Sequence, residues 1–179
     1  MRLFIGIPID PPVVKRLSKA ATRLRTTDDG LRWSAAESWH ITLQFLGKTD
    51  EEQYNCVVAR LREIRFRPVP VRIESLDFFD RAGVFFAGVG VSRELLELQK
   101  QVTAATSQCG FESEDRAYHP HVSLARSKDR QGARAFRQLR NRIGPEAKFG
   151  AFVAEEFLLY ESIPHPGGSK YIVRERFSL

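Results

Sequence analysis

His40-Ile41-Thr42-Leu43 is one of two short stretches that decide the fold of this 179-residue chain, and His121-Val122-Ser123-Leu124 is the other. The two stretches lie 81 residues apart (121 minus 40). The same shift places Leu3-Phe4-Ile5 on Val84-Phe85-Phe86 and Leu17 on Leu98. Because one ungapped offset aligns a strand, a helix and a polar–apolar motif, the sequence indicates an internal duplication.

The apolar patterns predict similar elements in the two halves. In the first half we expect strands at 2–9, 39–46 and 69–79, a helix from Pro11 with Val13, Leu17, Ala20 and Leu24 on one face, and a second helix after a capping box at Thr49-Asp50-Glu51-Glu52. In the second half we expect strands at 83–90, 120–126, 148–160 and 171–178, a helix capped by Ser92 and stopped by Gly110, and an Arg-rich helix at 129–143. The sequence therefore predicts one α+β domain, 1–179, with approximate halves 1–80 and 81–179. We expect two pseudo-symmetric β-α-β-α-β lobes whose antiparallel sheets face a central cleft.

The composition is that of a globular protein with a moderate basic excess. Lys and Arg total 28 against 22 acidic residues, which gives a net charge of +6. Such a charge favours a polyanionic partner, although a plain solvated surface has the same composition. No stretch approaches the length of apolar residues that spans a bilayer, and the N-terminal residues lack the features of a signal peptide, so we expect no membrane and a cytoplasmic location. Cys56 and Cys109 are then expected to be reduced core residues, with no disulfide.

The two motifs carry the chemistry. Side chains alternate along a strand, so His40 and Thr42 project to one face, as do His121 and Ser123. The intervening Ile41, Leu43 and Phe45, and likewise Val122 and Leu124, are expected to face a core. A two-fold axis between the lobes would bring both polar faces together. A neutral imidazole can then accept a proton from water while a protonated one donates to a leaving oxygen, and the hydroxyls can donate hydrogen bonds to phosphate oxygens. This scheme needs no metal and no cofactor.

The chain resembles the two-histidine phosphoesterases, and among them the RNA 2′,3′-cyclic phosphodiesterases that are also called 2′-5′ RNA ligases. The matching stretches are Arg2–Ile7, Arg32-Trp33, His40–Gly47 and His119–Arg126. The resemblance implies hydrolysis of an RNA 2′,3′-cyclic phosphate end to a 2′-phosphate, with His40 as proton donor and His121 as proton acceptor. It also implies that Thr42, Ser123 and Arg126 bind the substrate. The second hydroxyl is Ser123, where the family usually has Thr.

Several alternatives stay open at the level of sequence. The same residues could join RNA ends through a 2′-5′ bond or open another cyclic nucleotide phosphate. Strict alternation places Arg126 on the core face with Val122 and Leu124, so its role depends on a bulge or on the end of the strand. His119 could join His121 in a metal site, Trp33 or Tyr118 could stack on a base, and the helix at 129–143 could follow an RNA backbone. We expect RNA as the partner and no obligatory protein partner.

Overall fold

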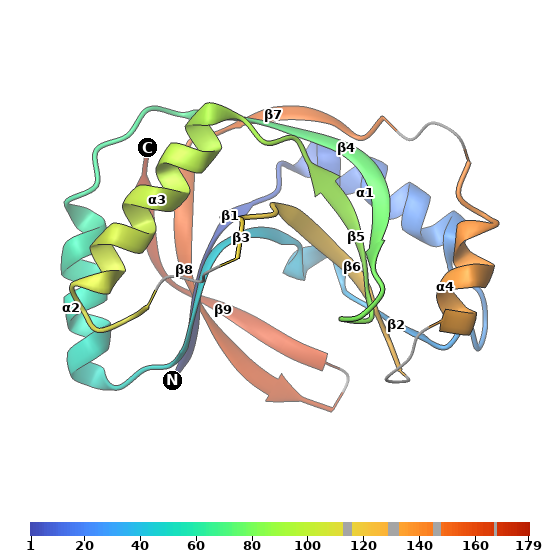
Figure 1. The fold of residues 1–179 in the computed structure, drawn as a ribbon, viewed down its shortest axis with the longest axis horizontal. Coiled ribbons are helices and arrows are strands. Elements are labelled where there is room, and N and C mark those ends of the chain that lie inside the picture. Colours follow the sequence, from blue (N-terminus) through green and yellow to red (C-terminus); the bar gives the residue numbers. More distant parts are fainter. Residues whose placement is uncertain (113–115, 129–132, 145–147, 167) are drawn as a thin grey trace.

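Two antiparallel sheets form the framework of the computed structural model, which describes all residues except 113–115, 129–132, 145–147 and 167 (Figure 1). The first sheet has the order β3-β1-β8-β9. Its strands are β1 (Arg2–Pro8), β3 (His40–Lys48), β8 (Glu156–His165) and β9 (Gly168–Ser178). The second sheet has the order β2-β6-β5-β4-β7. Its strands are β2 (Leu31–Trp33), β4 (Val69–Phe79), β5 (Val84–Val89), β6 (His121–Ser127) and β7 (Gly150–Ala154). The predicted α+β class with two antiparallel sheets is confirmed.

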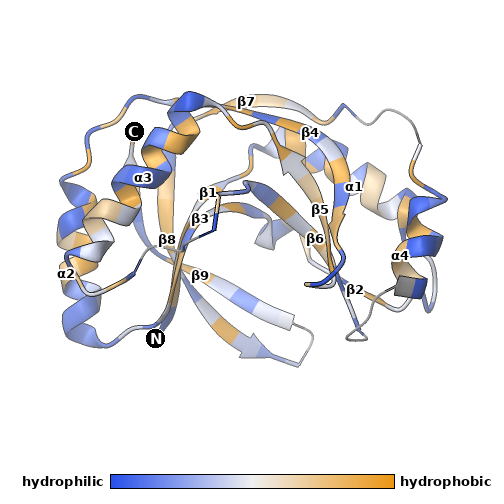
Figure 2. Cartoon of the chain, in the orientation of Figure 1, coloured by the Kyte–Doolittle hydropathy of each residue, from blue (hydrophilic) through white to orange (hydrophobic). Residues whose placement is uncertain are grey.

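The helices divide between the two sheets. Their bounds are α1 (Pro11–Leu24), α2 (Glu51–Arg62), α3 (Arg93–Ser107) and α4 (Ala133–Arg140), with a short 3-10 helix at Ala36–Ser38. In Figure 1, α2 and α3 lie together at the end of the molecule beside the first sheet, and α1 and α4 lie at the opposite end. The predicted face of α1 is confirmed, since Val13, Leu17, Ala20 and Leu24 are its buried residues. Figure 2 shows apolar stripes on the helices and apolar residues along the central strands, as packing of helices on sheets requires.

Each sheet combines strands from both halves of the chain. When the two sheet orders are compared, β3 corresponds to β6, β1 to β5, β8 to β4 and β9 to β7. Strand β4 of the first half thus lies beside β5, while β8 of the second half lies beside β1. The halves 1–80 and 81–179 therefore do not coincide with the two sheets. This exchange interlocks the two halves, because each sheet needs the other half to complete it.

The strand pairing also corrects the alignment of the first strands. Pro8 pairs with His40 and Gly88 pairs with His121, so these partners are 80 residues apart (88 minus 8) rather than 81. The ungapped shift of 81 residues aligns the two motifs correctly, but it misaligns the neighbouring strands β1 and β5 by one residue.

Other element boundaries differ from the sequence expectation for local reasons. The capping box begins at Asp50, which accepts from the Gln53 amide at 2.8 Å while Gln53 accepts in return, so it lies one residue later than predicted. The strand expected at 148–160 is broken at Glu155 into β7 and β8, which belong to different sheets. Helix α4 covers only the later part of the predicted 129–143, and 129–132 lie outside the described residues.

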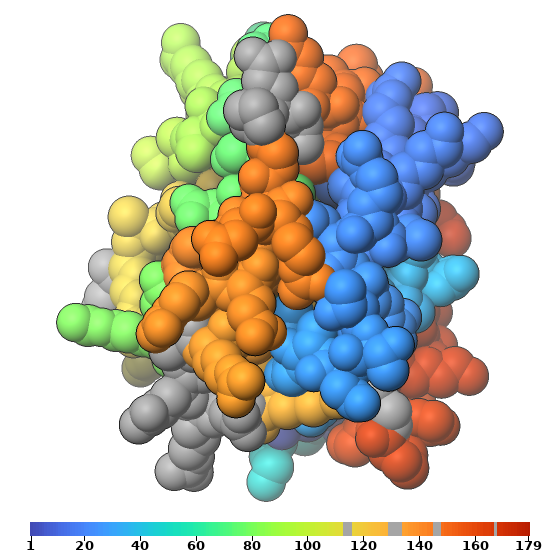
Figure 3. All heavy atoms as spheres, turned by 90° about the vertical axis from the view of Figure 1, so that its right-hand side faces the viewer, coloured from blue at the N-terminus to red at the C-terminus, as the bar shows by residue number. Residues whose placement is uncertain are grey.

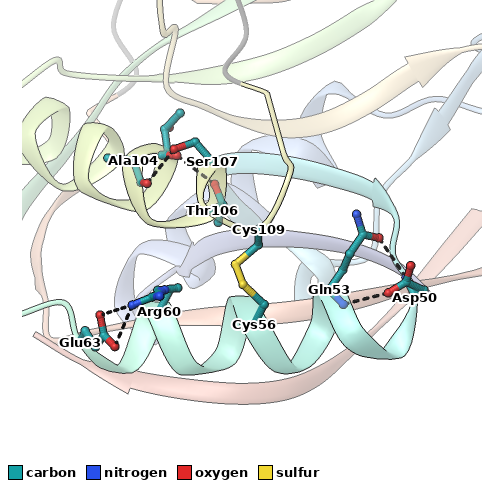
Figure 4. The surroundings of a disulfide bond; sticks show 10 residues. Asp50, Gln53, Cys56, Arg60, Glu63, Ala104, Thr106, Ser107 and Cys109 are labelled. Carbon is teal, nitrogen blue, oxygen red and sulfur yellow. Dashed lines mark hydrogen bonds and ion pairs between the residues drawn. A yellow bond between two sulfur atoms is a disulfide. The ribbon is translucent and has the colours of Figure 1, made fainter.

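Cys56 and Cys109 form a disulfide, which contradicts the expectation of two reduced core cysteines. Figure 4 shows that the bond joins α2 to the segment just after α3. Sequence patterns locate each cysteine on its own helix but not the distance between the helices, and here the Cα atoms are 5.8 Å apart. Thr106, one turn earlier, donates a buried hydrogen bond of 2.7 Å to Gln44 of β3. The disulfide therefore fastens the helix pair that supports strand β3.

None of the helices among the described residues combines the length and the apolar character that crossing a bilayer requires.

Candidate active site

His40 and His121 occupy equivalent places at the start of β3 and β6. These two strands are in contact where the two sheets approach each other. Each histidine is half-buried, and each is followed by a buried aliphatic residue and then by a half-buried hydroxyl, Thr42 or Ser123. The paired faces predicted from the two motifs thus exist on both strands. The two imidazoles are close enough that the charge of His121 contributes to lowering the pKa of His40.

Each imidazole makes an equivalent hydrogen bond to a backbone carbonyl. Nδ1 of His40 is 2.7 Å from the carbonyl oxygen of Ser38, and Nδ1 of His121 is 2.8 Å from the carbonyl oxygen of His119. A carbonyl oxygen only accepts, so Nδ1 carries the proton in each ring and Nε2 is left to exchange protons. In both cases the carbonyl lies two residues before the histidine. The segment before each strand therefore sets the tautomer of the ring that follows it.

Aromatic side chains surround each histidine. The ring of His40 lies 4.6 Å from Phe4, 5.6 Å from Tyr160 and 5.2 Å from Tyr171, measured between centroids. This burial lowers the pKa of His40 to about 4, and the hydrogen bond to Ser38 opposes the shift only in part.

The ring of His121 has a similar but more open setting. It contacts Phe79 and Phe86 at 5.0 and 5.3 Å. Burial is again the largest cause that lowers the pKa of His121, with smaller contributions from His119 and Arg126. Both imidazoles of the free protein are therefore neutral at pH 7.

A bulge in each motif strand changes which residues share the site. In β3, Ile5 pairs with Gln44 and Gly6 with Thr42, which leaves Leu43 as an extra residue. Two residues of one face then follow each other, so Gln44 is buried and Phe45 is 60% exposed. The expectation that Phe45 faces the core is wrong for this reason.

The bulge in β6 decides the position of Arg126. Phe85 pairs with Ala125 and Phe86 with Ser123, which leaves Leu124 as the extra residue. Arg126 is therefore exposed on the side of His121 and Ser123, and its charge contributes to the lowered pKa of His121. The structure thus supplies the bulge on which the predicted role of Arg126 depended.

Arg32 lies beside a candidate site residue, and sequence reasoning gave it no role. It pairs directly with Arg126 across β2 and β6, so both guanidinium side chains belong to the same face of the second sheet. Strand β2 was not predicted because it has only three residues. The carboxylate of Asp29 fixes its start, accepting from the Leu31 amide at 2.9 Å and from Nε1 of Trp33 at 2.7 Å. The pair Asp-x-x-x-Trp is the signal that could have revealed this turn.

Gly6 allows His40 to lie against β1. A Cβ atom at this position would be 2.9 Å from the carbonyl oxygen of Ile41 and 3.3 Å from Cδ2 of His40. Only glycine leaves room for the present position of the imidazole.

The other residues considered from the sequence have structural contacts. The hydroxyl of Tyr118 donates to the carbonyl oxygen of Thr42 at 2.9 Å, which ties the segment before β6 to β3, and burial raises its pKa. Trp33 is bonded to Asp29, and its ring lies edge-on to the buried Phe85. Base stacking by Trp33 or Tyr118 stays a prediction. In the part of the chain that is described, no three His, Cys, Asp or Glu side chains come together as metal ligands would.

A model of the 2′-5′ RNA ligase superfamily matches residues 11–159. The chain belongs to this superfamily. Among curated members, it is similar to the RNA 2′,3′-cyclic phosphodiesterase of Methanocaldococcus jannaschii, with 28% identity over 97% of this chain and 98% of the relative. It is also 30% identical to the enzyme of the same name from Aeropyrum pernix, over 84% of this chain and 88% of the relative.

Solved structures share the fold of this chain. The crystal structure of a Thermus thermophilus protein is similar at a TM-score of 0.77, with 27% identity over 100% of this chain and 98% of that one. The fold of Escherichia coli LigT, crystallised with 3′-AMP, is similar at a TM-score of 0.84, with 23% identity over 99% of this chain and 97% of that one. The superfamily model and the curated relatives confirm the resemblance noted from the two motifs, and with it the prediction of a phosphodiesterase.

Proposed function

We propose that this protein hydrolyses RNA 2′,3′-cyclic phosphate ends to 2′-phosphates by metal-independent acid–base catalysis. The observation that carries the proposal is the matched pair of histidines, each with Nδ1 bound to a backbone carbonyl and Nε2 left to exchange a proton. Hydrolysis of a cyclic diester needs one group that accepts a proton and one that donates a proton, on opposite sides of phosphorus. The names of the curated relatives supply the substrate class.

The proposed reaction is a displacement at phosphorus by water. Nε2 of His121 accepts a proton from water, and the water oxygen forms a bond to phosphorus. The bond between phosphorus and the ribose 3′-oxygen breaks, and Nε2 of His40 donates its proton to that oxygen. The products are a 2′-phosphate and a free 3′-hydroxyl. Thr42 and Ser123 donate hydrogen bonds to the non-bridging oxygens, where negative charge lies in the transition state.

The substrate itself supplies the condition for His40 to act as the donor. Burial keeps His40 neutral in the free protein at pH 7, since its pKa is about 4. A phosphate anion placed beside the imidazole favours the charged form and raises its pKa. We therefore infer that His40 takes up its proton when the substrate binds, while His121 remains neutral as the acceptor. Arg126 binds the same phosphate, and its positive charge helps to keep His121 neutral.

Product analysis tests the proposal. The protein is incubated with a short RNA that ends in a 2′,3′-cyclic phosphate, in excess EDTA, and the product is identified by phosphorus NMR. We expect a 2′-phosphate and an unchanged rate in EDTA. A 3′-phosphate would mean that the leaving oxygen lies at the other histidine. Activity that is lost in EDTA, restored by zinc and lost again in His119→Ala would contradict the mechanism.

The superfamily description favours a second reaction, the joining of RNA ends through a 2′-5′ bond. The same two histidines serve it, because ligation is the reverse of opening a 2′-5′ linkage at a cyclic phosphate. Incubation of an RNA that ends in a 2′,3′-cyclic phosphate with an RNA that has a 5′-hydroxyl separates the two reactions. A joined product in place of the 2′-phosphate would favour ligation.

We propose a cytoplasmic location for this activity, because RNA is processed there. The disulfide argues against this location, since such bonds are rare in the reducing cytosol of most organisms. Alkylation of Cys56 and Cys109 in freshly lysed cells, read by mass spectrometry, measures the state of the bond where the protein works.

A further inference from the structure

A basic groove runs along the outer side of α1. It has a volume of about 680 Å³, and its charged lining consists of Lys15, Arg16, Lys19, Arg23 and Lys148. Ser18, Thr22 and Phe149 complete the described lining. Figure 3 shows this side of the molecule, with α1 and α4 next to each other. Among the described residues that line the groove, every charged side chain is cationic.

Within the described part of the chain, the cations of α1 have no acidic partners of the kind that other helices have. Helix α1 contains no Asp or Glu. Among the described residues, every ion pair joins side chains outside α1; in α2 and α3, for example, Arg60 pairs with Glu63 and Arg93 with Glu97. Like charges four residues apart destabilise a helix by about 0.2–0.5 kcal/mol per pair. Helix α1 carries two such pairs, Lys15 with Lys19 and Lys19 with Arg23.

The remaining two cations close the groove on its other side. Arg16 donates a hydrogen bond of 3.2 Å to the carbonyl oxygen of Phe149, which joins α1 to the segment before β7. Lys148 is the exposed residue just before that contact. The groove is therefore built from two segments that are far apart in the sequence, and Arg16 fixes their separation.

The groove lies behind the second sheet, away from the two histidines. The buried face of α1 belongs to the same core as Val122 and Leu124 of β6. Because strand residues alternate, His121 and Ser123 project from the opposite face of that sheet. A ligand in the groove therefore occupies a second site.

We propose that this groove binds the sugar-phosphate backbone of RNA, at a distance from the reacting end. Lys15, Lys19 and Arg23 follow one line along the helix with a rise of about 6 Å between neighbours, so they present a row of donors to a row of phosphates. Lys, Arg and hydroxyl groups are the side chains that contact phosphates without reading sequence. Binding at this groove would therefore not depend on the RNA sequence. The inference rests on the proposed function only in taking RNA as the substrate.

Direct binding tests the groove separately from catalysis. A fluorescein-labelled RNA with an ordinary 3′-hydroxyl end is titrated with the full chain, and anisotropy is followed between about 50 and 200 mM salt. The variant Lys15→Gln/Lys19→Gln/Arg23→Gln removes three cations. We expect its affinity at low salt to fall on the order of 10-fold or more, and the slope of log affinity against log salt to fall by about 2, since each single-strand contact contributes about 0.7.

A matched control removes the same charge elsewhere. Arg60→Gln/Arg65→Gln/Lys100→Gln changes exposed residues at the other end of the molecule and should leave affinity and slope near those of the unchanged protein. Hydrolysis of a mononucleotide 2′,3′-cyclic phosphate, which is too small to reach the groove, should be equal in all three proteins. This second measurement separates a failure of the groove from a failure of the proposed function.

Three results would overturn the inference. Unchanged RNA affinity and slope in the α1 variant would show that the groove does not contact the backbone. An equal loss in the control would mean that only net charge matters. If the α1 variant keeps its affinity for RNA but loses binding to phosphatidylserine vesicles, the groove serves a membrane surface instead.

Discussion

Lowering the pH should destabilise this protein through His40. Its pKa is about 4 in the folded state, against 6.5 for an ordinary histidine. The unfolded chain therefore binds a proton first as the pH falls, so the stability that His40 contributes is present above pH 6.5 and is lost toward pH 4. Two and a half pKa units correspond to about 3 kcal/mol in full. Between pH 7.5 and 5 the expected loss is about 2 kcal/mol.

The variant His40→Gln isolates this contribution. Urea unfolding followed by circular dichroism at several pH values gives the free energy of unfolding of both proteins. The stability of the variant should fall about 2 kcal/mol less than that of the unchanged protein over the same range, because the titrating group is gone. His119→Gln is the matched control, since it makes the same replacement at an exposed histidine outside the aromatic cluster around His40.

NMR titration of the imidazole protons tests the lowered pKa of His40 directly. His40 should remain neutral well below pH 6, and inorganic phosphate should raise its pKa, since an anion favours the charged ring. A His40 signal that titrates near pH 6.5 without phosphate would refute the reasoning, as would parallel stability curves for the unchanged protein and His40→Gln. Either result would mean that Phe4, Tyr160 and Tyr171 do not exclude water from the ring.

The remaining predictions concern the site and its support. His40→Ala and His121→Ala should each reduce single-turnover rates roughly 100- to 10,000-fold with unchanged circular dichroism, and the double variant should lose far less than the product of both, since the two act in one step; near-normal activity of either single variant would contradict the assignment. Ser123→Ala should cost about 2–4 kcal/mol of transition-state stabilisation or less in the same assay, whereas Ser123→Thr should be tolerated; an inactive Ser123→Thr would mean that the second motif is misread. Gly6→Ala should lower kcat more than it raises KM, because a Cβ atom 3.3 Å from Cδ2 of His40 displaces the ring; unchanged kcat would show that the ring has room to move. Cys56→Ser should lower the free energy of unfolding by up to about 4 kcal/mol in urea, as expected for a cross-link over 53 residues. Detection of two free thiols in the native protein would remove the basis of that last prediction.

The sequence by itself determined most of the elements and the two motifs. Local periodicity located the face of α1 and strand β4, because an amphipathic helix or strand needs only neighbouring residues to define its buried side. The repeat of His-x-Thr and His-x-Ser also sufficed to pair the two histidines, since a repeated motif implies repeated positions. The roles of His40 as donor and His121 as acceptor remain predictions.

Only the tertiary structure decided what depends on pairing between distant segments. Sequence periodicity cannot predict the exchange of β4 and β8, because a strand has the same alternation of apolar and polar residues in either sheet. The bulges at Leu43 and Leu124 follow from register with β1 and β5, and they alone expose Phe45 and Arg126 beside the motifs. The disulfide likewise depends on how α2 and α3 pack. Local sequence fixes which face of an element is apolar, whereas the partner strand or helix fixes which residues finally meet.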